Sequence, residues 1–86
     1  MKLLWEDRAW SEYLYWQTQD KKTLKRINAL IKDILRSPYD GIGKPEPLRA
    51  NLSGWWSRRI DDTNRIVYYE QNGIIYIISC LGHYDN

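Results

Sequence analysis

Residues 55–80 read WWSRRIDDTNRIVYYEQNGIIYIISC, and this stretch decides the fold. It contains three runs of aromatic and β-branched residues, a composition that favours strands. The runs are residues 55–60, 65–70 and 74–80. Polar residues 61–64 and 71–73 separate them, and the Asn72-Gly73 pair is typical of a tight hairpin turn. We therefore expect two successive antiparallel hairpins.

The residues before this stretch predict a short strand followed by two helices. Residues 3–5 are apolar, and Glu6 and Asp7 suit the first turn of a helix. Asp20 is a good N-cap for a second helix, in which apolar residues recur every three or four positions up to Leu35. The order β-α-α-β-β-β predicts an α+β fold, with a helical hairpin packed on a small, mainly antiparallel sheet. Residues 37–48 hold all three prolines and are expected to form a loop.

Length and cysteine content narrow the class of protein. The 86 residues correspond to one domain, residues 1–86. Cys80 is the single cysteine, so an internal disulfide is excluded, and no second Cys or His stands at metal-ligand spacing. We expect no metal and no cofactor. The sequence has neither a signal peptide nor an apolar run long enough for a membrane span, so we expect a cytoplasmic protein.

Charge is concentrated in the second predicted helix. The whole chain carries a net charge of +2, but residues 21–36 contain six Lys or Arg against a single Asp33. A basic helix of this kind can meet the phosphates of a nucleic acid. Alternatively, it is simply the solvated face of the helix.

Four residues could carry acid–base or phosphate chemistry. His83 is the only histidine, and its ordinary pKa suits proton transfer, although a lone histidine is more often structural. Arg59 and Arg65 flank the first hairpin turn and should lie roughly opposite each other, where a phosphate or a nearby carboxylate would neutralise them. Glu46 lies between Pro45 and Pro47, which restrict its segment to extended conformations. It could equally be a solvated loop residue.

Several blocks of the chain, taken together, resemble a known family. They are GKPEPL at residues 43–48, NLSGWWSRRI at 51–60, RIVY at 65–68 and the HY pair at 83–84. With Trp5 and residues 13–16, these blocks resemble the YoeB-type toxins of the RelE superfamily over essentially the whole chain. The resemblance implies a RelE-like fold and a toxin of a type II toxin–antitoxin system. It also implies an endoribonuclease that enters the ribosomal A site and cuts the messenger RNA there.

The resemblance also implies roles for individual residues. The residues matching Glu46 and His83 act in that family as general base and general acid, and the residue matching Arg65 stabilises the reacting phosphate. Those matching Arg59 and Tyr84 hold and orient the RNA, and Arg49, which stands where a lysine is expected, is counted with them. Members of the family pair with an antitoxin whose C-terminal segment wraps the toxin, and toxin homodimers occur.

RNA carries its own nucleophile in the 2′-hydroxyl, so cutting requires a base, an acid and stabilisation of the phosphate charge, but no metal. As the resemblance implies, Glu46 can serve as the base, His83 as the acid and Arg65 as the stabiliser of the phosphate charge. Two other readings remain at this point. One is a non-catalytic module that binds single-stranded RNA through aromatic and arginine side chains. The other is a ribonuclease that works without the ribosome.

Overall fold

The computed structural model describes residues 1–83 and confirms the predicted order of elements. A strand precedes the two helices, and shorter elements follow them. The elements are β1 (Lys2–Trp5), α1 (Asp7–Gln19), α2 (Lys21–Arg36), β2 (Glu46–Pro47), a single 3-10 turn η1 (Ala50–Leu52), β3 (Trp56–Arg59), β4 (Arg65–Gln71) and β5 (Ile74–Ser79). No helix among residues 1–83 is long and apolar enough to cross a lipid bilayer.

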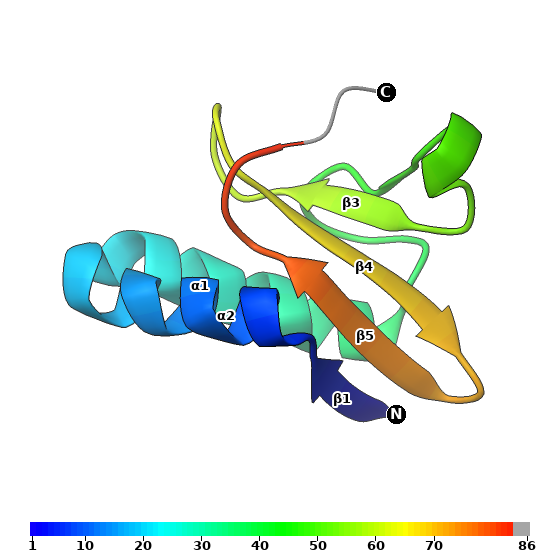
Figure 1. Cartoon of the computed structure of the whole chain (residues 1–86), viewed down its shortest axis with the longest axis horizontal. Helices are drawn as coiled ribbons and strands as arrows, with labels where there is room; N and C mark the ends of the chain where they lie inside the picture. Colours follow the sequence, from blue (N-terminus) through cyan, green and yellow to red (C-terminus); the bar gives the residue numbers. More distant parts are fainter. Residues whose placement is uncertain (84–86) are drawn as a thin grey trace.

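The strands form one sheet in the order β1-β5-β4-β3-β2 (Figure 1). Strands β3, β4 and β5 are joined by two hairpins and pair antiparallel, as predicted. Asn72 and Gly73 have φ angles of 54° and 77°, which is the backbone that the Asn-Gly turn requires. Strand β1 pairs parallel with β5, because the chain crosses from one end of the sheet to the other through the helices.

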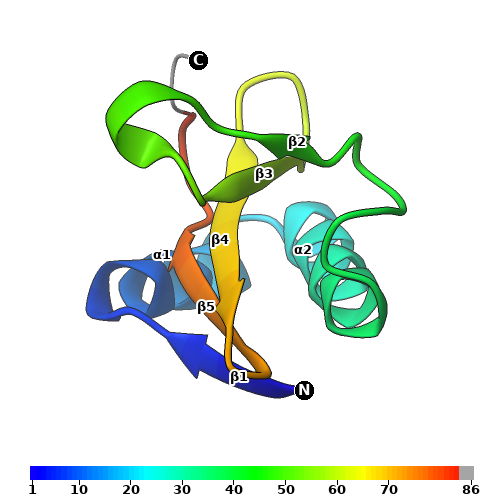
Figure 2. The same ribbon diagram turned by 90° about the vertical axis from the view of Figure 1, so that its right-hand side faces the viewer.

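The two helices lie side by side against one face of the sheet (Figure 1, Figure 2). Helix α2 buries an apolar stripe of Ile27, Leu30, Ile31 and Ile34, which matches the predicted helical spacing. Asp20 caps this helix as predicted, since its carboxylate accepts hydrogen bonds from the backbone N–H groups of Lys22 and Thr23. The stripe packs on a buried set of sheet residues, Ile66, Tyr68, Ile75 and Ile77.

Helix α1 is fastened to the end of β5 by polar contacts. The Trp16 indole N–H donates to the carbonyl of Cys80 at 2.9 Å, and the Cys80 N–H donates to the Glu12 carboxylate at 2.9 Å. Cys80 is fully buried beside Ala9. These contacts fix the direction in which the chain leaves the sheet toward His83.

The prediction that residues 37–48 form only a loop is wrong at its end. Glu46 and Pro47 form the edge strand β2, with Glu46 opposite Ser57 and Pro47 opposite Trp56. The prolines hide this strand in the sequence, because proline cannot donate to a ladder and is tolerated only at an edge. The strand places Glu46 on the sheet instead of in a solvated loop.

Candidate active site

The face of the sheet away from the helices carries two of the predicted site residues, Glu46 and Arg65. Side chains alternate between faces along a strand, and Ile66 and Tyr68 point into the helix-covered core. Arg65 therefore points to the outer face. Its Nε donates to the Ser57 hydroxyl at 2.9 Å, which places Ser57 on that face as well. Because Glu46 is opposite Ser57 in the ladder, these three residues from three adjacent strands converge.

Arg65 and Glu46 form an ion pair at this point. Arg65 Nη2 lies 3.1 Å from Glu46 Oε1, and the two side chains are 19% and 50% exposed. The Nη2 atom itself is buried, and among the described residues it has no partner with hydrogen-bond alignment. The two charges are therefore close together, but the N–H bonds of Nη2 are not aligned with the Glu46 oxygen. The hydrogen-bonding capacity of Nη2 is thus not saturated by Glu46, and a phosphate could use it once the Arg65 side chain moves.

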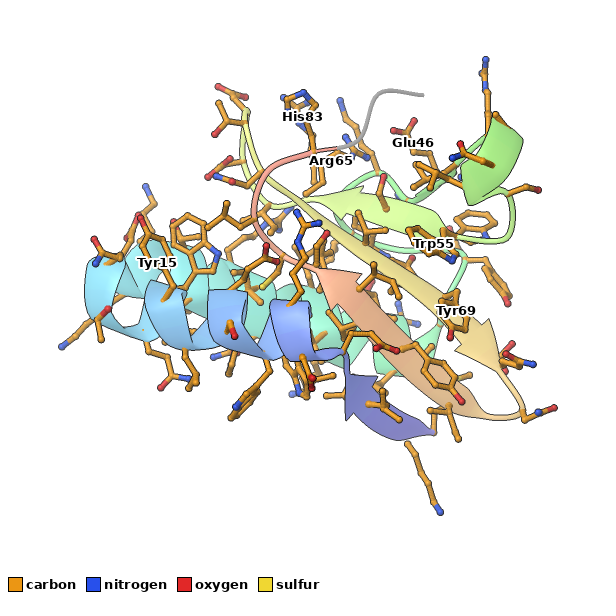
Figure 3. The ribbon with its side chains drawn as sticks, viewed as in Figure 1. Tyr15, Glu46, Trp55, Arg65, Tyr69 and His83 are labelled. Carbon is orange, nitrogen blue, oxygen red and sulfur yellow. The ribbon has the colours of Figure 1, made fainter. Side chains whose placement is uncertain are left out.

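His83 follows a segment that is fixed to the same end of the sheet. The backbone N–H of Arg65 donates to the Gly82 carbonyl at 2.8 Å, and the Gly82 N–H donates to the Asn64 side chain at 2.8 Å. Gly82 has a φ of 80°, which a residue with a side chain rarely adopts. In Figure 3, His83, Arg65 and Glu46 lie in a row at this end of the molecule. His83 is exposed, and Tyr84 lies outside the described residues.

Arg59 lies directly opposite Arg65, as the predicted register requires. Each arginine is neutralised by a different carboxylate, since Arg59 Nη2 lies 2.9 Å from Asp62 Oδ1 in the hairpin turn. Of the alternatives considered from the sequence, an ion pair with Asp62 is therefore present for Arg59. The pair is exposed, so solvent and salt screen it, and a phosphate can compete for the guanidinium.

Arg49 is not brought to the Arg65–Glu46 pair by any described contact. It precedes η1, its side chain is exposed, and its carbonyl accepts a hydrogen bond from Leu52. Its place three residues beyond Glu46 keeps it on the same segment as the site. A role in binding RNA remains a prediction for this residue.

The segment that holds Glu46 has two unusual backbone positions. Lys44 and Ala50 have φ angles of 52° and 56°, in the left-handed region that non-glycine residues seldom adopt. Such positions cost on the order of 1–3 kcal/mol each and are found mainly where a functional segment is held in a set direction. They bracket Glu46, whose direction is therefore imposed by the surrounding fold.

A buried arginine that sequence reasoning did not single out anchors the loop before Glu46. Arg58 is fully buried, and its Nη1 forms a 2.6 Å ion pair with Asp33. The remaining N–H groups reach oxygen atoms of Ile42, Ser37, Asp40 and Tyr68. A Cβ at Gly41 would collide with the Asp33 carboxylate, so the loop can wrap this closely only with glycine there. The signal in the sequence was a charged residue at a strand position that points into the core.

Asp33 has the electrostatics of a strongly stabilised carboxylate. Its pKa is held well below the ordinary range by the hydrogen bond from Arg36, then by the Ile42 N–H and by Arg58. The charged form is therefore maintained beneath the loop. This arrangement neutralises Arg58, which would otherwise be a costly buried charge.

The chain matches one protein family over nearly its full length. Residues 5–84 match the model of the YoeB-like toxin of bacterial type II toxin–antitoxin systems. The chain is 57% identical to Toxin YoeB of Synechocystis sp. over 85 residues, which cover 99% of each chain. It is 52% identical to Toxin YoeB of Escherichia coli over 84 residues, 98% of this chain and 100% of the relative.

Solved structures show the same fold. A YoeB/ParE toxin from Agrobacterium tumefaciens superposes with a TM-score of 0.93 at 42% identity, covering 98% of this chain and 100% of the other. A YoeB dimer from Staphylococcus aureus gives 0.90 at 44% identity, and a heterotetrameric YoeB–YefM toxin–antitoxin complex from that organism gives 0.89 at 44%. Each comparison with the S. aureus protein covers 98% of both chains. The chain therefore belongs to the YoeB-like toxins of bacterial type II toxin–antitoxin systems.

Proposed function

We propose that this toxin is a ribosome-dependent endoribonuclease that cuts messenger RNA in the A site and so inhibits translation. The observation that carries the proposal is the exposed Glu46 carboxylate held 3.1 Å from the Arg65 guanidinium, at the end of the sheet where the chain reaches His83. A base, a phosphate ligand and an acid are the groups that cleavage by the RNA 2′-hydroxyl requires.

Glu46 accepts the proton of the 2′-hydroxyl, and the 2′ oxygen attacks the adjacent phosphorus. Arg65 moves from the carboxylate to the phosphate and stabilises the negative charge that develops on its oxygens. His83 in its protonated form donates a proton to the departing 5′ oxygen as the P–O5′ bond breaks. The products are a 2′,3′-cyclic phosphate and a 5′-hydroxyl, so no water is consumed in this step.

The small site by itself contributes little to aligning the RNA for the reaction. Holding the 2′ oxygen in line with the phosphorus contributes a large share of the rate, and a ribosome that fixes the messenger strand provides it. Lysines along α2, including Lys21, Lys22, Lys25 and Lys32, are exposed and fit a role in docking on ribosomal RNA. Two other basic residues of the helix have internal partners, since Arg26 donates to the Arg59 carbonyl and Arg36 pairs with Asp33. This function places the protein in the cytoplasm.

We also propose that an antitoxin protein inhibits this chain by covering the site. The S. aureus relative forms a complex with YefM, and this chain groups Arg59, Arg65 and His83 at one end of the sheet, where the two arginines are paired only with local carboxylates. An acidic segment that orders on contact would neutralise these residues together. A homodimer, as in the S. aureus dimer, is the corresponding proposal for the antitoxin-free toxin.

The test is cleavage of an end-labelled messenger with and without programmed ribosomes, using wild-type protein and His83→Gln. We expect cuts within the A-site codon only when ribosomes are present, and loss of most cutting in the variant, because the proton donor is removed. Equal cutting of free RNA would identify an autonomous ribonuclease. RNA binding with no cleavage under either condition would identify a non-catalytic module.

A further inference from the structure

The outer face of the sheet continues beyond the candidate active site into a pocket of about 550 Å³. Its walls come from the start of α1 and from strand residues on the same face. The lining residues are Glu6, Asp7, Arg8, Trp55, Tyr69 and Ile78. Trp55 and Tyr69 lie next to each other beyond Glu46 in Figure 3. We refer to these six residues as the aromatic pocket.

Strand geometry connects the aromatic pocket with the site. Tyr69 is four positions after Arg65 on β4 and therefore points to the outer face, and Trp55, two positions before Ser57, lines the same pocket. Two residues along a strand span about 7 Å, which places Trp55 within reach of a nucleotide next to the one at Glu46. A β-bulge in β5 adds Ile78 between the partners of Tyr68 and Val67, and Ile78 forms part of the pocket wall.

The walls suit a flat, uncharged ring. Trp55, Tyr69 and Ile78 are half-buried, so each presents part of its surface. Tyr69 stacks on Tyr76 with ring centres 4.5 Å apart and planes 8° apart, which holds its ring in one orientation. Every nucleobase can stack on such an aromatic face.

The rim of the aromatic pocket is acidic and would repel a phosphate or an acidic peptide. Glu6 and Asp7 are exposed carboxylates, and Arg8 next to them is ion-paired with Glu12 at 3.0 Å. Carboxylates accept hydrogen bonds and therefore favour the N–H groups of a base edge. Burial, then Tyr76 and Glu6, raises the pKa of Tyr69, so its hydroxyl stays protonated and can donate.

We propose that the aromatic pocket binds a nucleobase of the substrate RNA, one that neighbours the cut phosphate and presents N–H donors. The proposal rests on the proposed function, because it names a binding position for the RNA that Glu46 and Arg65 act on. It accounts for an aromatic surface and a pair of carboxylates on a face whose other end carries Arg65, the proposed phosphate ligand.

The first experiment measures single-turnover cleavage on programmed ribosomes with wild-type toxin, Tyr69→Leu, Tyr69→Phe and the matched control Tyr15→Leu, which changes an exposed tyrosine at the other end of α1 (Figure 3). We expect Tyr69→Leu to raise the half-saturating toxin concentration about 10-fold, the effect of losing one base stack, while Tyr69→Phe stays near wild type. An abasic nucleotide at one position should weaken wild type equally and leave Tyr69→Leu unchanged. Wild-type behaviour of Tyr69→Leu, or fully additive effects, would overturn the proposal.

A second experiment detects RNA in the aromatic pocket without requiring cleavage. Failure of the pocket proposal can therefore be distinguished from failure of the proposed function. A short RNA carrying 4-thiouridine next to a 2′-deoxy cut site is irradiated with the wild-type toxin on programmed ribosomes. Crosslinks mapped to Trp55 or Tyr69 support the proposal even if the protein cuts nothing. Crosslinks confined to other residues contradict the proposal. The proposal is also contradicted if an antitoxin peptide, but not RNA, shields the Tyr69 side chain.

Discussion

Arg65 Nη2 lies 3.1 Å from Glu46 Oε1, yet the two atoms lack the alignment of a hydrogen bond. The fold therefore holds Glu46, the proposed base, next to Arg65, the proposed phosphate ligand. Before RNA enters, each neutralises the other. In the proposed mechanism, the phosphate of the bound RNA attracts Arg65, and Glu46 is left beside the 2′-hydroxyl with an uncompensated charge that can accept its proton.

This pairing predicts that Glu46→Gln separates binding from chemistry. The variant loses the base, so the cleavage rate should fall by about 10²- to 10⁴-fold. The half-saturating concentration should stay equal or decrease, because a negative charge near the phosphate is removed. Single-turnover kinetics on programmed ribosomes measure both quantities. The matched control is Glu70→Gln, whose carboxylate contacts Tyr39 and Gly73 and which should cut at the wild-type rate.

Arg65 variants separate charge from geometry. Arg65→Lys keeps the charge but loses the planar fork and the Nε donor to Ser57, so we expect a loss of about 10- to 100-fold in rate. Arg65→Ala should lose about 10²- to 10³-fold, as when one donor to a developing charge is removed. End-group analysis of the wild-type product should find a 2′,3′-cyclic phosphate. A free 3′-hydroxyl, or a wild-type rate in Arg65→Ala, would show that the mechanism is wrong.

The Asp33–Arg58 pair should dominate the stability of the loop before Glu46. Asp33→Asn leaves the fully buried Arg58 without its carboxylate, which should lower the free energy of unfolding by about 3–5 kcal/mol. Arg36→Gln is the control. The Arg36 side chain is 68% exposed and pairs with Asp33 at the surface, so its replacement should lower the free energy of unfolding by about 0–1 kcal/mol. Urea unfolding distinguishes the two. Equal losses would mean that burial of Arg58 does not set the energy.

The lowered pKa of Asp33 gives this contribution a pH dependence. A depressed carboxyl pKa stabilises the folded state above the unfolded pKa of about 3.9, and the stabilisation is lost as pH falls toward the folded value. The urea midpoint of the wild type should therefore decrease below about pH 4. Asp33→Asn, measured over the same range, should show a shallower decrease. Parallel curves for the two proteins would assign the acid sensitivity to other groups.

Cys80 should be chemically silent in the folded toxin. Burial, and then the nearby Glu12 carboxylate, raises its thiol pKa to about 12, so almost no thiolate exists at neutral pH. We expect a thiol reagent such as DTNB to react at once in urea but over hours in native buffer. Rapid stoichiometric labelling of the native protein would contradict the buried position of Cys80.

Local chemistry explains which parts of the structure could be predicted from the sequence. The hairpin strands follow from aromatic and β-branched runs, the turn from Asn72-Gly73, and the start of α2 from Asp20, because each signal acts within a few residues. The opposed positions of Arg59 and Arg65 follow from the length of the turn.

Features that depend on contacts between residues distant in the sequence could not be predicted from local patterns. Strand β2 has two residues, one of them a proline, and exists only because Ser57 and Trp56 lie beside it. Arg58 stands next to Arg59 in the sequence, and its inward strand position was not recognised because its partners, among them Asp33, come from distant parts of the chain. The aromatic pocket combines the start of α1 with β4, β5 and Trp55, which precedes β3, so no local pattern marks it.

The place of β5 in the sheet also sets the order in which the molecule can be completed. The last strand to be synthesised lies between β1, which is made first, and β4. Until residues 74–79 leave the ribosome, β1 has no neighbour in the sheet and the core beneath α1 is open. A chain that stops before β5 therefore lacks the strand that pairs with β1 and packs against α1, and we expect such a chain to remain unfolded.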